Sequence, residues 1–169
     1  MELKEALLRR RSIRKFTDQP VTDAEIDALM HAAMSGPSAC NKQPWAFYAV
    51  TGAQKLDALR GATHFSRMAA PLAVVVCGDL NRALPRELAA YWVQDCSAAT
   101  QNILLRATVL GLGAVWCGVH PQPRAEKNVA EALDLEETLV PLNIIWIGHP
   151  AEEAEPRDWY DAERVRIIR

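Results

Sequence analysis

The residues from Leu72 to Gly78, which follow Pro71, form a run without a single polar side chain, and three consecutive valines lie at its centre. A strand with one face toward water alternates apolar and polar residues, whereas a strand covered on both faces has no need to. This run therefore predicts a strand in the middle of a sheet that carries helices on both sides. Such a chain folds as an α/β or α+β sandwich.

Helices and further strands are expected to alternate around this run. Apolar residues at helical spacing predict helices over residues 2–9, 22–35, 54–59, 87–110 and 124–133. Thr22 stands three residues before Glu25, which is a capping-box pattern for the second helix. Apolar and β-branched runs predict strands at residues 45–50, 114–119 and 142–147, with a short strand at 164–168. The sheet is therefore expected to have four or five strands.

The size and charge of the chain suggest one small domain with a small ligand. With 169 residues and 18.7 kDa, the chain is expected to form a single domain over residues 1–169. The net charge of -2 and the pI near 6.1 provide no positive field for nucleic acid or a membrane surface. A local cluster of arginines in such a chain favours a small anionic partner.

The cysteines point to a reducing compartment. No two cysteines form a CxxC pair, and no cysteine has a histidine at the spacing of a metal site. The four are Cys40, Cys77, Cys96 and Cys117. The first residues lack the order of a signal peptide, and the apolar runs are too short for a membrane span. We expect a cytoplasmic protein without disulfides or metal.

Familiar catalytic motifs are missing. The chain has no GxSxG nucleophile turn, no GxxxxGKS/T phosphate loop and no HExxH zinc motif. The pair Gly111 and Gly113 lacks the third glycine of a dinucleotide fingerprint and ends a helix instead of opening one. Residue types therefore indicate no acid, base or nucleophile that would carry a reaction.

Four arginines and a serine fall within residues 9–14. One interpretation is a solvated cluster, since arginines at the end of a helix suit its dipole. The other is a phosphate site, because Arg10, Ser12 and Arg14 would point to one side of an extended segment. Guanidinium groups that converge in this way bind phosphate through paired hydrogen bonds.

A second stretch, residues 36–45, is rich in turn-forming residues and also carries two carboxamides. Its prolines and polar residues are sufficient to explain a simple connection between a helix and a strand. However, Asn41 and Gln43 each offer both a donor and an acceptor, which suits the edge of a heterocycle. We therefore keep both a turn and a ligand-binding loop as interpretations, with Cys40 as lining.

The triplet Trp116-Cys117-Gly118 stands at the end of a predicted strand. Strand ends often border ligand sites, and Gly118 permits a close approach of the backbone. The alternative is an ordinary strand end. Cys117 has no charged neighbour in sequence, so we expect a neutral, packed thiol.

Four segments, in order and over nearly the whole chain, resemble the FMN-dependent nitroreductase family. They are Arg-Arg-Ser-Ile-Arg-Lys-Phe near the start, Pro-Ser-Ala-Cys-Asn-Lys-Gln-Pro-Trp after the second helix, Gly-Leu-Gly-Ala-Val-Trp-Cys-Gly, and Ile-Gly-His-Pro-Ala-Glu-Glu near the end.

The resemblance implies an α+β fold, a nitroreductase-like α/β/α sandwich with a central mixed sheet, in an intertwined homodimer with FMN at the subunit interface. It implies that the FMN phosphate and the nearby ribityl or ring edge are held by Arg10, Arg11, Ser12 and Arg14. It further implies flavin contacts, partly from the other subunit, for Pro37, Ser38, Ala39, Cys40, Asn41 and Gln43. The backbone of Trp116, Cys117 and Gly118 would face the flavin ring, and Arg157 would help to bind phosphate.

The same resemblance implies an enzyme in which NADH or NADPH reduces FMN, which then reduces a nitroaromatic, a quinone or another small aromatic acceptor in a ping-pong reaction. A basic residue before the central strand contacts the flavin in many members, and Arg67 is the candidate. The chain is short where larger members carry a lid over the substrate. The alternatives are a flavin-binding sensor or interaction protein without turnover, and a related reaction such as ene reduction or dehalogenation.

Overall fold

The strand predicted at the centre of the sheet lies there in the computed structural model, which describes residues 1–169. The sheet has four strands, in the order β1-β2-β4-β3. Their bounds are Trp45–Val50 for β1, Leu72–Asp79 for β2, Gly113–Gly118 for β3 and Leu139–Gly148 for β4. Every residue of β2 up to Gly78 is buried. The predicted α+β class and the interior position of this run are confirmed.

The sheet is antiparallel throughout, so the expectation of a mixed sheet was wrong in this respect. A helix that follows a strand normally returns the chain to the start of that strand, and the next strand is then parallel. Here α3 (Ala53–Ala62) is followed by residues 63–71, which bring the chain back once more. The only parallel pairing in the chain is an isolated bridge between Ser12 and Ala114.

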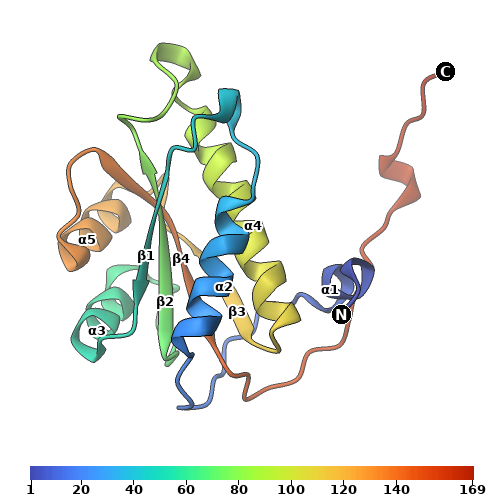
Figure 1. Cartoon of the computed structure of the whole chain (residues 1–169), viewed down its shortest axis with the longest axis horizontal. Coiled ribbons are helices and arrows are strands. Elements are labelled where there is room, and N and C mark those ends of the chain that lie inside the picture. The colour runs from blue at the N-terminus through green and yellow to red at the C-terminus, as the bar shows by residue number, and fades with distance from the viewer.

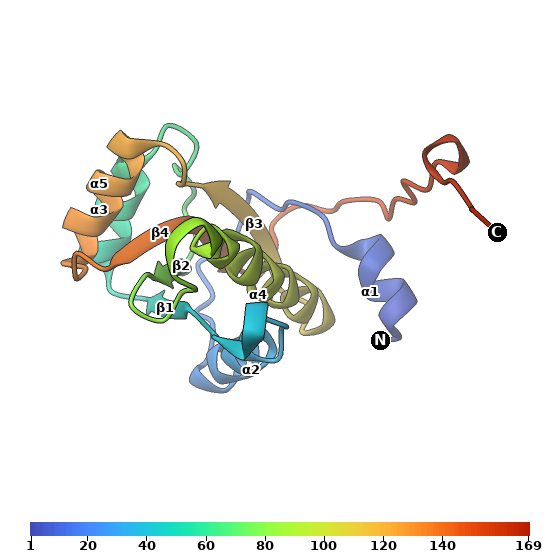
Figure 2. The same cartoon turned by 90° about the horizontal axis from the view of Figure 1, so that it is seen from above.

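Two pairs of helices cover the two faces of the sheet (Figure 2). One face carries α2 (Asp23–Met34) and α4 (Tyr91–Val109), and the other carries α3 and α5 (Pro123–Leu133). The predicted capping box closes the start of α2, since the Thr22 side chain accepts from the Glu25 N–H and Glu25 accepts from the Thr22 N–H. The α/β/α sandwich is thereby confirmed.

The sheet divides the apolar core into two layers. Leu72, Val74 and Val76 pack toward α2 and α4, whereas Val75 and Trp146 pack toward α3 and α5. The core thus encloses the central strands β2 and β4, while β1 and β3 lie at the edges of the sheet.

No helix is both long enough and apolar enough to pass through a bilayer.

Two expectations about the ends of elements were wrong. The predicted helix at 87–110 begins only at Tyr91, because a 3₁₀ turn at Arg86–Leu88 precedes it, with Arg86 at φ 58°. Residues 164–168 form no strand, since the chain beyond residue 150 leaves the domain as an arm and has no strand edge beside it (Figure 1). A strand requires a neighbour to satisfy its backbone.

Candidate functional site

A cavity of about 470 Å³ lies against the free edge of β3. Its walls come from the loop after α3, from the segment after α1 and from β3, through Arg14, Phe65, Met68, Val115, Trp116, Cys117 and Gly118. This volume falls in the range of small-molecule sites, which are mostly apolar with a few polar groups. The structure thus joins Arg14 to the predicted Trp116–Gly118 triplet in one cavity.

The backbone of β3 offers unused hydrogen-bond donors to this cavity. The carbonyl of Ala114 accepts from the Ile13 N–H at 3.0 Å, so it points away from β4. Polar backbone groups alternate in direction along a strand, and those of Trp116 and Gly118 therefore point the same way. Consistent with this alternation, the Val119 N–H points inward and donates to Leu142.

The segment after α1 is fixed against the beginning of β3. Ser12 forms the bridge with Ala114, and a side chain at Gly113 would place its Cβ 2.7 Å from Ile13 Cγ2. The absence of a side chain at Gly113 thus allows the close approach. Arg14 lies exposed, without a carboxylate partner, at the margin of the cavity.

The other predicted arginines do not line this cavity, and they make contacts elsewhere in the chain. Arg10 ends α1 and its N–H donates to Ala6 at 2.9 Å, while the Arg11 guanidinium donates to the backbone carbonyl of Glu155. The Arg157 N–H donates to Leu8 at 3.0 Å, and its guanidinium carbon lies 5.1 Å from the Trp159 ring centroid. The beginning of the C-terminal arm is therefore held against the arginine segment, residues 9–14, and the end of α1.

The second predicted stretch has an unusual backbone. Cys40, Asn41 and Gln43 have φ values of 49°, 53° and 48°, all in the left-handed region although none is glycine. This conformation costs of order 1 kcal/mol or more per residue and is often retained at functional sites. These three residues are exposed, and so is Pro37. Ser38 and Ala39 are half-buried. The strain supports a binding role over a simple turn.

A buried carboxylate of α4 holds this loop. Asp95 is 6% exposed, and its Oδ1 accepts from the Ala39 N–H at 2.8 Å. The Ser38 hydroxyl accepts from the Gln43 N–H at 2.9 Å. Asp95 was not among the residues expected from sequence, although a carboxylate on the apolar face of a long helix is a usable signal.

The Cys117 thiol is a lining group and not a nucleophile. Burial raises its pKa to about 11, an effect that the positive charge of Arg14 only partly offsets. Its sulfur lies 3.3 Å from the Phe65 carbonyl. The expected neutral, packed thiol agrees with this environment.

One chain does not bring the two predicted stretches together. Strands β1 and β3 are opposite edges of the sheet. Trp45, at the end of one stretch, pairs with Gly78, and Gly78 pairs with Val140 of β4. Ala114, which contacts the other stretch, pairs with Ile147 of β4. The positions of Val140 and Ile147 are roughly 24 Å apart along β4. Figure 1 shows the loop before β1 and the segment after α1 at opposite ends of α2.

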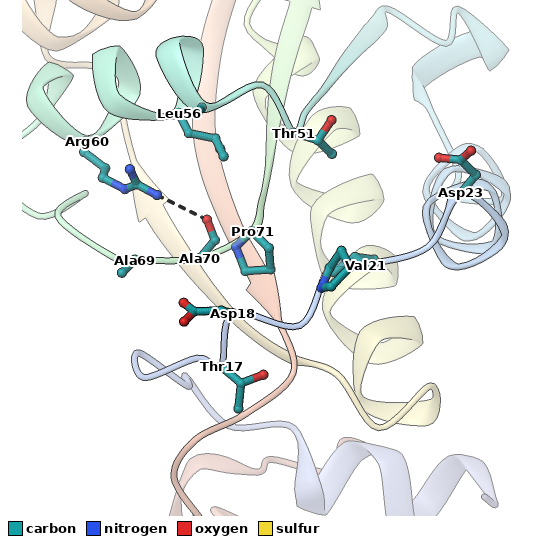
Figure 3. A pocket seen from close by; sticks show the side chains of 12 residues that line it. Thr17, Asp18, Val21, Asp23, Thr51, Leu56, Arg60, Ala69, Ala70 and Pro71 are labelled. Carbon is teal, nitrogen blue, oxygen red and sulfur yellow. Dashed lines mark hydrogen bonds between the residues drawn. The ribbon is translucent and has the colours of Figure 1, made fainter.

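A different cavity, of about 480 Å³, lies between α3 and the segment that leads into α2 (Figure 3). It contains none of the predicted site residues. Its one guanidinium, that of Arg60, donates to the Met68 carbonyl at 2.9 Å and to the Ala70 carbonyl at 3.4 Å, and it is paired with Asp57. The groove also contains two carboxylates, those of Asp18 and Asp23, and offers no free positive charge for an anionic ligand, so it is not the candidate site.

Glu152 was not singled out from sequence, yet it orders the arginine segment. Its Oε1 accepts from the Arg14 N–H at 2.6 Å and from the Lys15 N–H at 3.2 Å. These bonds, that of Arg14 first, hold its pKa below the ordinary 4.5. The stabilisation is therefore present above pH 4.5 and is lost as the pH falls through the lower, folded-state pKa.

Glu152→Gln is accordingly expected to lower stability at pH 7, because a neutral acceptor makes a weaker hydrogen bond than a carboxylate. The difference from the unsubstituted protein should vanish at acid pH, where Glu152 is protonated in both states. Urea unfolding between pH 3 and 7 measures it. The matched control is Glu153→Gln, since Glu153 makes no hydrogen bond or ion pair. An equal, pH-independent effect of both substitutions would contradict this role.

The fold is shared with solved nitroreductases. The solved FMN-dependent nitroreductase of Clostridium difficile matches with a TM-score of 0.89 and 29% identity, over 98% of this chain and 99% of that one. The family model described as "Nitroreductase family" matches residues 7–66 and 65–149. The chain belongs to the nitroreductase family.

Two relatives support this assignment. A protein of Methanothermobacter thermautotrophicus, provisionally named NADH dehydrogenase/NAD(P)H nitroreductase, is 39% identical over 99% of this chain and 87% of its own length. The oxygen-insensitive NADPH nitroreductase of Salmonella typhimurium is 33% identical over 95% of this chain and 71% of its own length.

Proposed function

We propose that the protein is an FMN-dependent oxidoreductase that uses NADH or NADPH to reduce a small aromatic acceptor, such as a nitroaromatic or a quinone. The observation that carries the proposal is the cavity at the β3 edge, where one arginine and outward-facing backbone N–H groups border apolar walls. The relatives named above are nitroreductases and support the same chemistry.

The residues present fit FMN. Phe65, Met68 and Val115 give apolar walls for an aromatic ring, and Arg14 gives a free guanidinium for a phosphate. A Cβ at Gly118 would meet nothing within 4 Å, so the backbone there is open to a flat ligand. Bound FMN would supply hydride transfer, which explains why no acid, base or nucleophile is needed.

The chain's own groups would then bind the cofactor and orient its ring. The outward N–H groups of Trp116 and Gly118 can donate to acceptors on the ring edge, and donors fixed in this way favour negative charge on the ligand. With the ring bound, the apolar walls would keep water away from it. Ser12, together with Arg10, Arg11 and Arg157, would complete the phosphate site.

We further propose an intertwined homodimer that completes the site. Apolar side chains lie exposed on α1 and on the arm, including Leu3 at 67%, Trp159 at 75% and Ile168 at 95%. Exposed apolar groups in such numbers indicate a contact surface. The loop at residues 37–43 would reach the flavin of the partner subunit, since it is far from Arg14 in its own chain.

The absence of any disulfide among the four cysteines agrees with a reducing, cytoplasmic location, which we also propose.

The proposed function predicts that the purified protein is yellow, releases FMN on denaturation and oxidises NADH or NADPH when a quinone or nitroaromatic is added. Initial rates at several acceptor concentrations should give parallel double-reciprocal lines. A colourless protein that takes up no added FMN would overturn the proposal. A protein that binds FMN without turnover over a panel of acceptors would instead be a flavin-binding sensor.

Mixed subunits test the shared site. Arg14→Ala and Asn41→Ala each damage both sites of a homodimer. If each site combines Arg14 of one chain with Asn41 of the other, a mixed dimer has one intact site and recovers about half of the bound FMN. If both residues serve the same chain's site, mixing restores nothing. Light scattering of the same samples reports the oligomeric state.

A further inference from the structure

A third cavity, of about 550 Å³, lies between the loop after α3 and the beginning of α5, and it is called the second cavity below because it is considered together with the one at the β3 edge. Its lining includes the cationic side chains of Arg67 and Arg124 together with His64, and it contains no carboxylate. Arg67 therefore lines this cavity and not the one at the β3 edge. The proposed function does not use this positive cavity.

The two guanidinium groups have no partner within the chain. Neither Arg67 nor Arg124 takes part in an ion pair or a side-chain hydrogen bond. The nearest acidic residue in sequence, Glu126, is occupied, because its Oε1 lies 2.8 Å from His120 Nδ1. The positive charge of the cavity is thus uncompensated, which favours an anion.

The beginning of α5 adds backbone donors. Pro123 is the first helical residue, and the side chain of Gln122 makes no capping hydrogen bond. The N–H groups of Arg124 and Ala125, both lining residues, find no acceptor in the chain. Free N–H groups at the start of a helix of this length bind anions together with the helix dipole.

The loop between the two cavities is fixed. The Ser66 hydroxyl is fully buried and donates to the Leu59 carbonyl at 2.9 Å, and Asn128 donates to the Ala62 carbonyl at 3.0 Å. Around Ser66 the side chains diverge, since Phe65 lines the cavity at the β3 edge whereas Arg67 lines the second. The two cavities are therefore neighbours that share one rigid wall.

We propose that the second cavity binds a phosphate group of the reduced nicotinamide dinucleotide whose nicotinamide enters the cavity at the β3 edge. This inference rests on the proposed function. A dinucleotide carries its phosphates away from its reactive ring, and two cationic side chains with free helix N–H groups match a doubly charged phosphate. The candidates are the 2′-phosphate of NADPH and the pyrophosphate that NADPH and NADH share.

Arg124→Ala tests this in the FMN-loaded protein, with Lys127→Ala on the same helix as the control. Lys127 is exposed and outside the lining. Removing one charge-assisted hydrogen bond should raise the KM for the bound dinucleotide about tenfold or more at unchanged kcat and FMN content. A rise for NADPH alone assigns the 2′-phosphate, and an equal rise for NADH assigns the pyrophosphate.

Binding without turnover separates this inference from the proposed function. NADP⁺ and NAD⁺ are titrated calorimetrically into both variants, and the Kd should follow the same pattern as the KM. Unchanged KM and Kd in Arg124→Ala, or a loss of FMN in that variant, would overturn the phosphate site. A protein that oxidises neither NADPH nor NADH would overturn the proposed function, while binding of NADP⁺ or NAD⁺ that depends on Arg124 would still support the cavity.

Discussion

Replacing Arg14 with alanine is expected to weaken FMN binding about 10- to 100-fold and to leave the free energy of unfolding nearly unchanged. Charge-assisted hydrogen bonds contribute roughly 1.5–3 kcal/mol, whereas an exposed arginine without a carboxylate partner contributes little to folding. The side chain of Arg14 is exposed, and its one intrachain hydrogen bond is a long contact of 3.4 Å with the Ser12 carbonyl.

Flavin fluorescence quenching on titration of the apoprotein measures the affinity, and urea unfolding of the apoprotein measures stability. Lys15→Ala is the matched control, because Lys15 is the next residue, equally charged and exposed, but outside the cavity. If both substitutions weaken FMN equally, the arginine segment acts through general charge and not through a phosphate contact. If Arg14→Ala unfolds the protein, the segment is structural.

Gly118→Val is expected to lower the affinity for FMN about 100-fold or more, while the domain stays folded. A Cβ at this position meets no atom within 4 Å, and φ is not in the left-handed region, so a branched residue suits the strand. The same side chain would occupy space in the cavity beside the outward N–H groups. Steric overlap with a ligand costs more than the loss of one contact.

Gly113→Val gives the opposite result and serves as the comparison. Its Cβ would lie 2.7 Å from Ile13, so this substitution should lower the midpoint of thermal unfolding. Gly118→Ala should fall between glycine and valine in FMN affinity. Circular dichroism measures the loss of folding, and flavin absorbance measures the loss of bound FMN. A Gly118→Val protein that retains its full content of FMN would place the ring elsewhere.

Local pattern was enough to predict most elements, because the apolar run at Leu72–Gly78 and the capping box at Thr22 act through neighbours in sequence. Strand direction was not predictable, since it depends on how residues 63–71 return the chain. The strand expected at 164–168 was wrong because the chain offers no edge for it to pair with.

The candidate site shows the same division. The segment with Arg14 and the strand end at Gly118 were each visible in sequence, but only the fold shows that they share a cavity. Asp95 and Glu152 act through backbone N–H groups of residues far away in sequence, and no local pattern reports such partners. The roles of the individual FMN contacts remain predictions until the variants above are measured.

The outward-facing backbone of β3 is also expected to affect how the cell handles the protein. An uncovered strand edge is a template on which another extended chain can add, and natural proteins usually shield such edges. A ligand seated along Trp116 and Gly118 would act as that shield. Flavin supply would then govern how much of the newly made protein avoids aggregation, in addition to how much of it is active.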